Sequence, residues 1–370
     1  MNVIDKNNLG KLLQKLSKCG YAILGPKLGE GAIIYDEINS IEDLPAGWTD
    51  EQDAGKYRLK QRKDNSLFGY VIGPHSWKKF LFPPRLKLME AEKAGKSFEI
   101  IPISEKPPKY AFLGVRACEM NAIFIQDKVF NNSMFSDSFY NKVRNNSFII
   151  AVNCTNAAKT CFCVSMKTGP KVNSGYDIVL TEIIIEKEHY FTLETGSEKG
   201  EEFIDGLEMK PAGESEANKQ AKAIQNAELK MGRQLDTTDI KELFYCNIDS
   251  PQWNEVANRC LNCANCTMVC PTCFCSTVED VTDLIGNHAE RWRRWDSCFS
   301  LDYSKVAGGN FRTTAKARYR QWITHKLASW IDQFGTSGCV GCGRCISWCP
   351  VGIDITEEVK KLRSNKKLTS

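Results

Sequence analysis

The amino-acid sequence predicts two domains, an α/β (α+β) domain over residues 1–247 and an α-helical domain over residues 248–370. Three observations support this division. Strand–helix–strand order is visible between residues 110 and 154, which is typical of a parallel strand pair. From about residue 252 onward, cysteines become dense and strand signals vanish. The length of 370 residues is enough for two or three domains of ordinary size.

Periodic apolar patterns identify the elements of the first domain. Residues 9–19 carry leucines at helical spacing and predict a short amphipathic helix. The apolar segments 110–115 and 148–154 predict buried strands, and the segment 118–130 between them has helical periodicity. A β-hairpin is predicted over residues 177–195. Residues 213–234 are polar and helix-forming, and we expect a surface helix or a linker there.

The second domain is predicted to be built from helices. The segment 310–335 is rich in helix-forming residues and ends at a glycine, so it predicts one long helix. The stretch between residues 270 and 339 leaves room for two helices. The basic, Trp-containing run Arg291–Trp295 is interpreted as a solvated helix face. Charge compensation beside an anionic group, or docking of an acidic partner, is the alternative.

Charge and hydropathy exclude two classes of partner and favour one compartment. The formal net charge is +4 and no long Lys/Arg run occurs, so we expect no nucleic acid. No stretch of about 18 apolar residues is present, so no direct membrane insertion is expected. The N-terminus lacks a signal-peptide pattern, and the 17 cysteines are odd in number. We therefore expect a reducing, cytoplasmic setting rather than a disulfide framework.

Two cysteine motifs share one spacing. The motifs are Cys260-x2-Cys263-x2-Cys266-x3-Cys270 and Cys339-x2-Cys342-x2-Cys345-x3-Cys349, each followed by proline. In bacterial two-cluster ferredoxins, three thiolates of this run bind one [4Fe-4S] cluster and the fourth binds the other. The pattern therefore predicts a helical ferredoxin-type dicluster domain with two [4Fe-4S] clusters. Their predicted ligands are Cys260, Cys263, Cys266 and Cys349 for the first, and Cys339, Cys342, Cys345 and Cys270 for the second.

Zinc is the alternative metal for these cysteines. Structural zinc sites favour two C-x2-C pairs separated by a dozen or more residues. Triplets followed by Cys-Pro, occurring twice, do not have that pattern. A zinc-stabilised interaction protein without a redox role is therefore the least favoured hypothesis.

Four further cysteines lie in the first domain, namely Cys118, Cys154, Cys161 and Cys163. Cys118 and Cys154 each follow a predicted strand, and parallel α/β folds place ligands at strand ends. Together the four thiolates are candidates for a third [4Fe-4S] cluster. The spacing is not a standard motif, so buried free thiols are an equal alternative.

The remaining cysteines carry weaker signals. Cys273, Cys275 and Cys298 are one thiolate short of a full ligand set, so we interpret them as packing residues, with a ligand role as the alternative. Cys19 and Cys246 are isolated and are interpreted as structural. The four histidines form no Cys/His or Ser/His/Asp arrangement, and no G-x-G-x-x-G occurs. We therefore predict no catalytic residues and no nucleotide bound by this chain itself.

Several segments together resemble one protein family. They are GVRACEMNAIFIQDKVF (114–130), CFCVSMKTGP (161–170), RCLNCANCTMVCPTCFC (259–275) and GCVGCGRCISWCPVGIDI (338–355). They resemble the β subunit of cytoplasmic NiFe sulfhydrogenases, a family that includes the A subunit of anaerobic sulfite reductase. The resemblance extends from about residue 65 onward. It implies that Cys118, Cys154, Cys161 and Cys163 bind a third cluster, although Ala117-Cys118-Glu119 departs from the more usual Pro-Cys-Asp.

The resemblance also implies a function. It indicates a non-catalytic electron-transfer subunit of an oxidoreductase complex. A flavin-containing, NAD(P)H-binding subunit would exchange electrons with this chain in a hetero-oligomer, and a NiFe hydrogenase module would lie at the other end. A sirohaem sulfite reductase is the alternative module. The choice between them depends on family analogy and not on the chemistry of any site in this chain.

Overall fold

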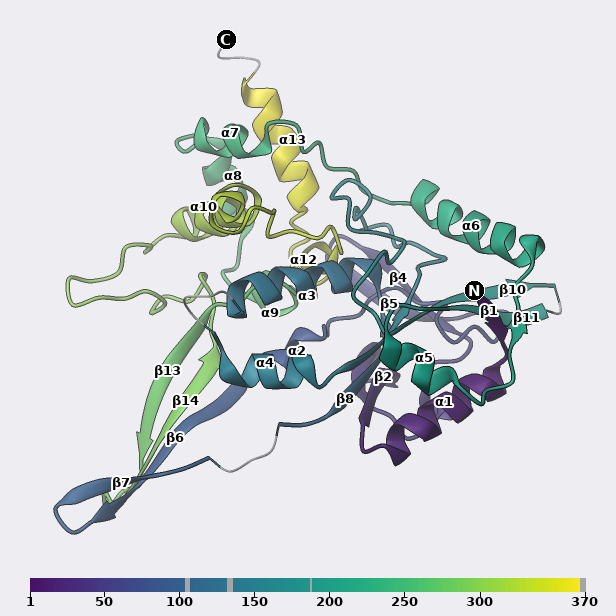
Figure 1. Ribbon diagram of the computed structural model, residues 1–370. Helices are drawn as coiled ribbons and strands as arrows, with labels where there is room; N and C mark the ends of the chain where they lie inside the picture. The colour runs from purple at the N-terminus through teal and green to yellow at the C-terminus, as the bar shows by residue number, and fades with distance from the viewer. Residues whose placement is uncertain (104–106, 132–135, 187, 367–370) are drawn as a thin grey trace.

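The computed structural model describes residues 1–103, 107–131, 136–186 and 188–366 (Figure 1). An eight-stranded mixed sheet forms the centre of the N-terminal region, in the order β12-β1-β11-β10-β9-β8-β2-β3. Its strands are β1 (Asn2–Ile4), β2 (Ala22–Gly29), β3 (Ala32–Glu37), β8 (Tyr110–Val115), β9 (Phe148–Val152), β10 (Ile178–Ile185), β11 (Glu188–Thr195) and β12 (Lys210–Pro211). The predicted parallel pair is confirmed as β8 and β9, and the predicted hairpin as β10 and β11.

Helices cover both faces of this sheet because successive residues of its buried strands point to opposite sides. Leu113 and Ile150 pack with the leucines of α1 (Lys6–Lys18) and with Phe203 of α5 (Glu198–Ile204). On the other face, Phe112 and Ile149 pack with α2 (Lys78–Leu81), α3 (Ala117–Phe130) and α4 (Ser138–Asn145). The predicted helices over 9–19 and 118–130 are therefore confirmed as α1 and α3. The polar segment after residue 213 contains α6 (Glu214–Leu229), which contacts β10.

The C-terminal region has a separate apolar core that includes Trp253, Ile323 and Val359. Its helices are α7 (Ile240–Tyr245), α8 (Gln252–Arg259), α9 (Asn265–Met268), α10 (Ala315–Thr324), a π-helical segment (His325–Ser329), α11 (Trp330–Phe334), α12 (Arg344–Ser347) and α13 (Ile355–Lys366). The long helix predicted over 310–335 begins at Ala315 and ends before Gly335, which has a φ of 68°. No helix in the part of the chain that the structure describes is both long and apolar enough to span a bilayer.

A second sheet corrects the expectation that strands are absent after residue 252. Two strands, β13 (Ser276–Thr282) and β14 (His288–Trp295), form a hairpin that joins β6 (Arg85–Ala94) and β7 (Ser97–Ile101) in the order β13-β14-β6-β7. This arm extends away from the rest of the molecule (Figure 1). Arg291–Trp295 therefore lies on a strand and not on a helix. The sheet joins strands from both sides of residue 247, and the boundary placed there stays a prediction.

A smaller two-stranded sheet lies close to the second cysteine motif. Its strands are β4 (Trp48–Asp53) and β5 (Lys56–Gln61), and β4 contacts α12. The short 3-10 helix Ile41–Asp43 precedes it. The amide nitrogen of Gly55, in the turn between the two strands, donates to the carbonyl oxygen of Ile346 at 3.0 Å. The N-terminal region thus supports the loop that carries the second motif.

Candidate iron–sulfur centres

The two cysteine motifs fold into loops of the same shape. Asn262 and Ala264 in the first loop have φ angles of 52° and 64°. Gly341 and Gly343, at the equivalent positions of the second loop, have 64° and 77°. Each loop then enters a one-turn helix, α9 or α12. The left-handed residues bend the backbone so that consecutive cysteines face inward, and the sequence repeat is thereby a structural repeat.

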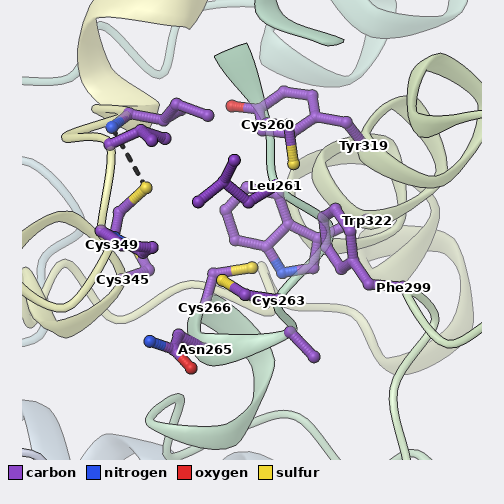
Figure 2. A pocket seen from close by; sticks show the side chains of 14 residues that line it. Cys260, Leu261, Cys263, Asn265, Cys266, Phe299, Tyr319, Trp322, Cys345 and Cys349 are labelled. Atoms are coloured by element: carbon purple, nitrogen blue, oxygen red, sulfur yellow. Dashed lines mark hydrogen bonds between the residues drawn. The ribbon is translucent and has the colours of Figure 1, made fainter. Parts of the chain in front are cut away.

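The ligands predicted for the first cluster line one cavity of about 30 Å³. Figure 2 shows Cys260, Cys263, Cys266 and Cys349 around this cavity, with Phe299, Tyr319 and Trp322 beside them. The Ile353 amide donates to the Cys349 sulfur at 3.2 Å, the kind of contact that stabilises a thiolate. Cys263 is exposed, so this cavity lies at the molecular surface.

The ligands predicted for the second cluster lie deeper in the protein. Cys270, Cys339 and Cys342 are buried, and Cys345 is half-buried. Burial raises the pKa of the Cys345 thiol well above its ordinary value, and the neighbouring thiols Cys339, Cys342 and Cys270 raise it further. Electrostatic influence weakens with distance, so these thiols lie near one another. The Gly341 amide donates to the Cys339 sulfur at 3.5 Å.

The four cysteines of the N-terminal region also converge on one cavity, of about 20 Å³. Cys118 lies in the first turn of α3, and Cys154 follows β9, at the adjacent ends of two parallel strands. Cys161 and Cys163 come from the loop that follows. Burial raises the pKa of Cys161 to about 12. Metal binding at these thiols must therefore release their protons, which makes loading less favourable as the pH falls.

The thiol spacing distinguishes a cubane from a single metal ion. A tetrahedral zinc ion with Zn–S bonds of about 2.3 Å holds its sulfurs roughly 3.8 Å apart. Among the described residues, no three cysteines have their sulfurs within 4.8 Å of one another. The irons of a cubane are separate ligand positions, and they require more widely spaced thiolates. These donor sets therefore fit [4Fe-4S] clusters and disfavour the zinc hypothesis.

The cysteines predicted for the second cluster lie between the other two cysteine sets. Cys345, a predicted ligand of the second cluster, also lines the first cavity. Cys342, another predicted ligand of the second cluster, lines the cavity of the N-terminal cysteines. The backbone also joins these loops, because the Phe162 amide donates to the Gly341 carbonyl oxygen at 2.9 Å. The three sets therefore form a row.

Substitution of Gly341 by alanine will disrupt this contact. A Cβ at Gly341 would lie 2.6 Å from the Phe162 backbone, in addition to the strain of a φ of 64°. Gly335→Ala is the matched control, since it has a φ of 68° but no atom within 4 Å of its Cβ. We expect the control to cost about 1 kcal/mol, and Gly341→Ala to cost clearly more. Urea denaturation of both variants measures this, and equal losses would contradict the close approach.

A buried ion pair joins the Cys118 helix to the second motif. Glu119 and Arg344 have side chains that are 1% and 0% exposed, and the Arg344 guanidinium donates to the Glu119 carboxylate. Glu119 also accepts from the Tyr35 hydroxyl at 2.9 Å and the Trp77 indole at 3.1 Å. Cys118 directly precedes Glu119, and Cys342 lies two residues before Arg344. The ion pair therefore holds the N-terminal cysteines against the dicluster loop.

Lys326 brings a buried positive charge to the thiols. Its ammonium donates to the Cys270 sulfur at 3.2 Å and to the Gly338 carbonyl oxygen at 3.0 Å. Burial lowers the pKa of Lys326, but the thiols of Cys270 and Cys273 raise it more, so the pKa lies well above its ordinary value. Lys326 occupies the π-helical segment, a feature that often occurs at functional sites.

Lys326→Met is expected to lower the reduction potential of the second cluster. Reduction adds negative charge beside the Cys270 thiolate, and the lysine stabilises that charge. We expect a fall on the order of 60 mV, a tenfold change in a one-electron equilibrium. A redox titration followed by electron paramagnetic resonance measures it, with exposed Lys305→Met as the control. A potential that is the same in both variants would contradict this role.

Sequence reasoning missed several of these residues. Glu119, Arg344 and Lys326 carry no motif of their own, although Glu119 follows Cys118 and Arg344 lies inside the second motif. Cys273, Cys275 and Cys298 line a further cavity together. Cys19 and Cys246 are exposed and line none of the cavities described above.

Comparison with known proteins agrees with this arrangement. Residues 259–353 match the family model of the 4Fe-4S dicluster domain. Over 352 residues the chain is 31% identical to sulfhydrogenase 2 subunit beta of Pyrococcus furiosus, which covers 92% of each chain. The chain belongs to the sulfhydrogenase β-subunit family. This β-subunit homologue is thus an iron–sulfur electron-transfer protein with [4Fe-4S] clusters. No solved structure matches the chain.

Proposed function

We propose that this β-subunit homologue relays electrons through a row of three [4Fe-4S] clusters in a hydrogenase complex. The clusters are held by the three cysteine sets described above. One end of the row would exchange electrons with a flavin-containing, NAD(P)H-binding subunit, and the other with a NiFe hydrogenase module. The bound clusters supply one-electron chemistry, and the chain's own residues hold and insulate them.

The proposal is supported most directly by two cysteines of the second set, each of which also lines a neighbouring cavity. Because Cys345 lines the first cavity and Cys342 lines the third, the second cluster would contact the surroundings of both neighbours. A relay needs such closely spaced centres, whereas metal sites that only stabilise a fold have no reason to form a row. Phe299, Tyr319 and Trp322 form the buried side of the first cavity, while Cys263 lies on its exposed side.

The two ends of the row differ in surface chemistry. Leu261 beside the first cavity is 63% exposed, which offers an apolar contact to a partner. At the other end, Thr155 and Asn156 follow Cys154 and line an open cleft of about 610 Å³. Charged side chains of both signs line this cleft, among them Lys222 and Glu182. The row therefore has two distinct ends at which partners can exchange electrons.

The assignment is tested by anaerobic purification of the native complex with its partner subunits. Nickel that co-purifies with the chain supports the hydrogenase complex, whereas sirohaem absorbance would replace it by a sulfite reductase complex. In the same preparation, Cys118→Ser should lower the iron and acid-labile sulfide content by about four of each per chain. Unchanged iron in that variant would reduce the relay to the two dicluster sites.

A further inference from the structure

Three cysteines outside the relay line a cavity of their own. Cys273, Cys275 and Cys298 surround about 20 Å³, a volume equal to that beside the N-terminal cysteine set. Cys273 and Cys275 follow the first motif, and Cys298 follows β14. Two chain segments therefore bring three half-buried thiols to one cavity near Cys270.

The first two of these cysteines repeat a local pattern of the third relay site. Cys161-Phe162-Cys163 and Cys273-Phe274-Cys275 are the same tripeptide. Phe162 is 1% exposed, and Phe274 packs edge-on against Trp330 with ring centroids 5.3 Å apart. In both tripeptides the phenylalanine is packed against the protein interior, and the flanking thiols line a shared cavity.

Two buried lysines, Lys326 in the cavity wall and Lys78 against the Cys273 backbone, indicate that an anion belongs beside these thiols. Lys78 and Lys326 are each 3% exposed, and among the described residues neither has a carboxylate within 4.0 Å. The Lys78 ammonium donates to the Cys273 carbonyl oxygen at 3.0 Å and lies 3.9 Å from the Trp295 ring centroid. Burying an ammonium group is strongly unfavourable without negative charge nearby. The Cys270 thiolate of the second relay cluster supplies negative charge for Lys326. Lys78 contacts the Cys273 segment instead, so its negative charge must come from a group bound there.

These thiols do not form a ready-made site for a single tetrahedral ion. Their sulfurs do not form, alone or with any described His, Asp or Glu side chain, a group of three ligand atoms within 4.8 Å. An ion with bonds of about 2.3 Å requires closer sulfurs. A multi-iron cluster binds separate thiolates through separate irons, and it carries the negative charge that the buried lysines require.

We propose that Cys273, Cys275 and Cys298 bind a fourth iron–sulfur cluster, a cubane held by three thiolates whose fourth iron has a non-cysteine ligand. Of the 17 cysteines, only Cys19 and Cys246 are left, and both are exposed, so no fourth thiolate is at hand. Lys78 and Lys326 balance the cluster's negative charge. The inference goes beyond the three-cluster relay and shares with it only the requirement for iron–sulfur loading.

Iron and acid-labile sulfide, counted per chain in the anaerobically purified native complex, test this site. Cys298→Ser should contain about four fewer of each than wild type, and Cys246→Ser should contain the wild-type amount. Equal iron in Cys298→Ser and wild type would overturn the fourth cluster. This result is independent of the proposed three-cluster relay, because Cys118→Ser changes the iron content of the third relay site alone.

A second measurement decides the matter if Cys298→Ser fails to fold. Ferricyanide accepts one electron from a cubane that has one iron without a thiolate, and that iron is lost: [4Fe-4S]2+ becomes [3Fe-4S]+ and Fe2+. We expect electron paramagnetic resonance to show one such [3Fe-4S] centre per wild-type chain, and none in Cys275→Ser. If titration with ferricyanide yields no [3Fe-4S] signal from wild type, or the same signal from Cys275→Ser, the proposal is wrong.

Discussion

Cys263→Ala will remove the first [4Fe-4S] cluster and leave the other cysteine sets loaded. Cys263 shares its cavity with Cys260, Cys266 and Cys349, and the methyl group of alanine offers iron no ligand. The other sets keep all of their own cysteines, so their loading should persist. Iron and acid-labile sulfide should each fall by about four per chain.

The control for this experiment is Cys19→Ala. Cys19 is exposed, caps the end of α1, and lines none of the cysteine cavities. It should therefore retain the iron of the wild-type protein. If Cys263→Ala also retained all of its iron, the ligand assignment of the first cluster would be wrong.

Glu119→Ala will destabilise the fold by about 3–5 kcal/mol, the usual cost of leaving one partner of a buried ion pair unpaired. The Arg344 guanidinium would lose its carboxylate in a site where neither side chain reaches solvent. The Tyr35 hydroxyl and the Trp77 indole would lose their acceptor as well. Urea denaturation of the anaerobic protein measures the loss as a lower midpoint.

The matched control removes an exposed ion pair. Asp280 pairs with Arg291 on the β13–β14 hairpin, where the two side chains are 59% and 46% exposed. Asp280→Ala should cost only about 0–1 kcal/mol because water screens the pair. A similar loss in both variants would show that Glu119 and Arg344 contribute no more than a surface contact.

Local patterns in the sequence predicted the parts of this molecule that depend on neighbouring residues. The parallel strands β8 and β9 and the helix α3 between them follow directly from apolar periodicity. The cysteine spacing predicted two ferredoxin-type loops, and both have left-handed residues at equivalent positions. Each of these elements is predicted by a pattern that lies within its own segment of the sequence.

Pairings between distant residues could not be predicted in this way. Strand β14 is paired with β6, which lies in the other half of the chain. Because no nearby segment reveals this pairing, the basic run Arg291–Trp295 was predicted to be helical. The hairpin stands where only helices were expected. Lys326 is one polar residue on an amphipathic segment, and only the π-helical turn and the packing around it place its ammonium against Cys270.

The N-terminal cysteines illustrate both cases. Their spacing left a cluster and four buried free thiols equally favoured. The structure places Cys118 and Cys154 at adjacent strand ends and brings Cys161 and Cys163 to the same cavity. This juxtaposition depends on the parallel pairing of β8 and β9, which no cysteine motif contains. A third cluster there is our proposal, and the iron content of Cys118→Ser decides it.

Electron transfer through the intact complex is the most direct test of the relay. The measurement compares wild type with Cys118→Ser, using NAD(P)H as the electron donor and hydrogen evolution by the partner module as the readout. A viologen dye that donates to the partner module directly controls for its activity. We expect NAD(P)H-driven hydrogen evolution to fall to background while viologen-driven evolution is unchanged. NAD(P)H-driven evolution at the wild-type rate, in a variant shown to lack the third cluster's iron, would contradict the relay.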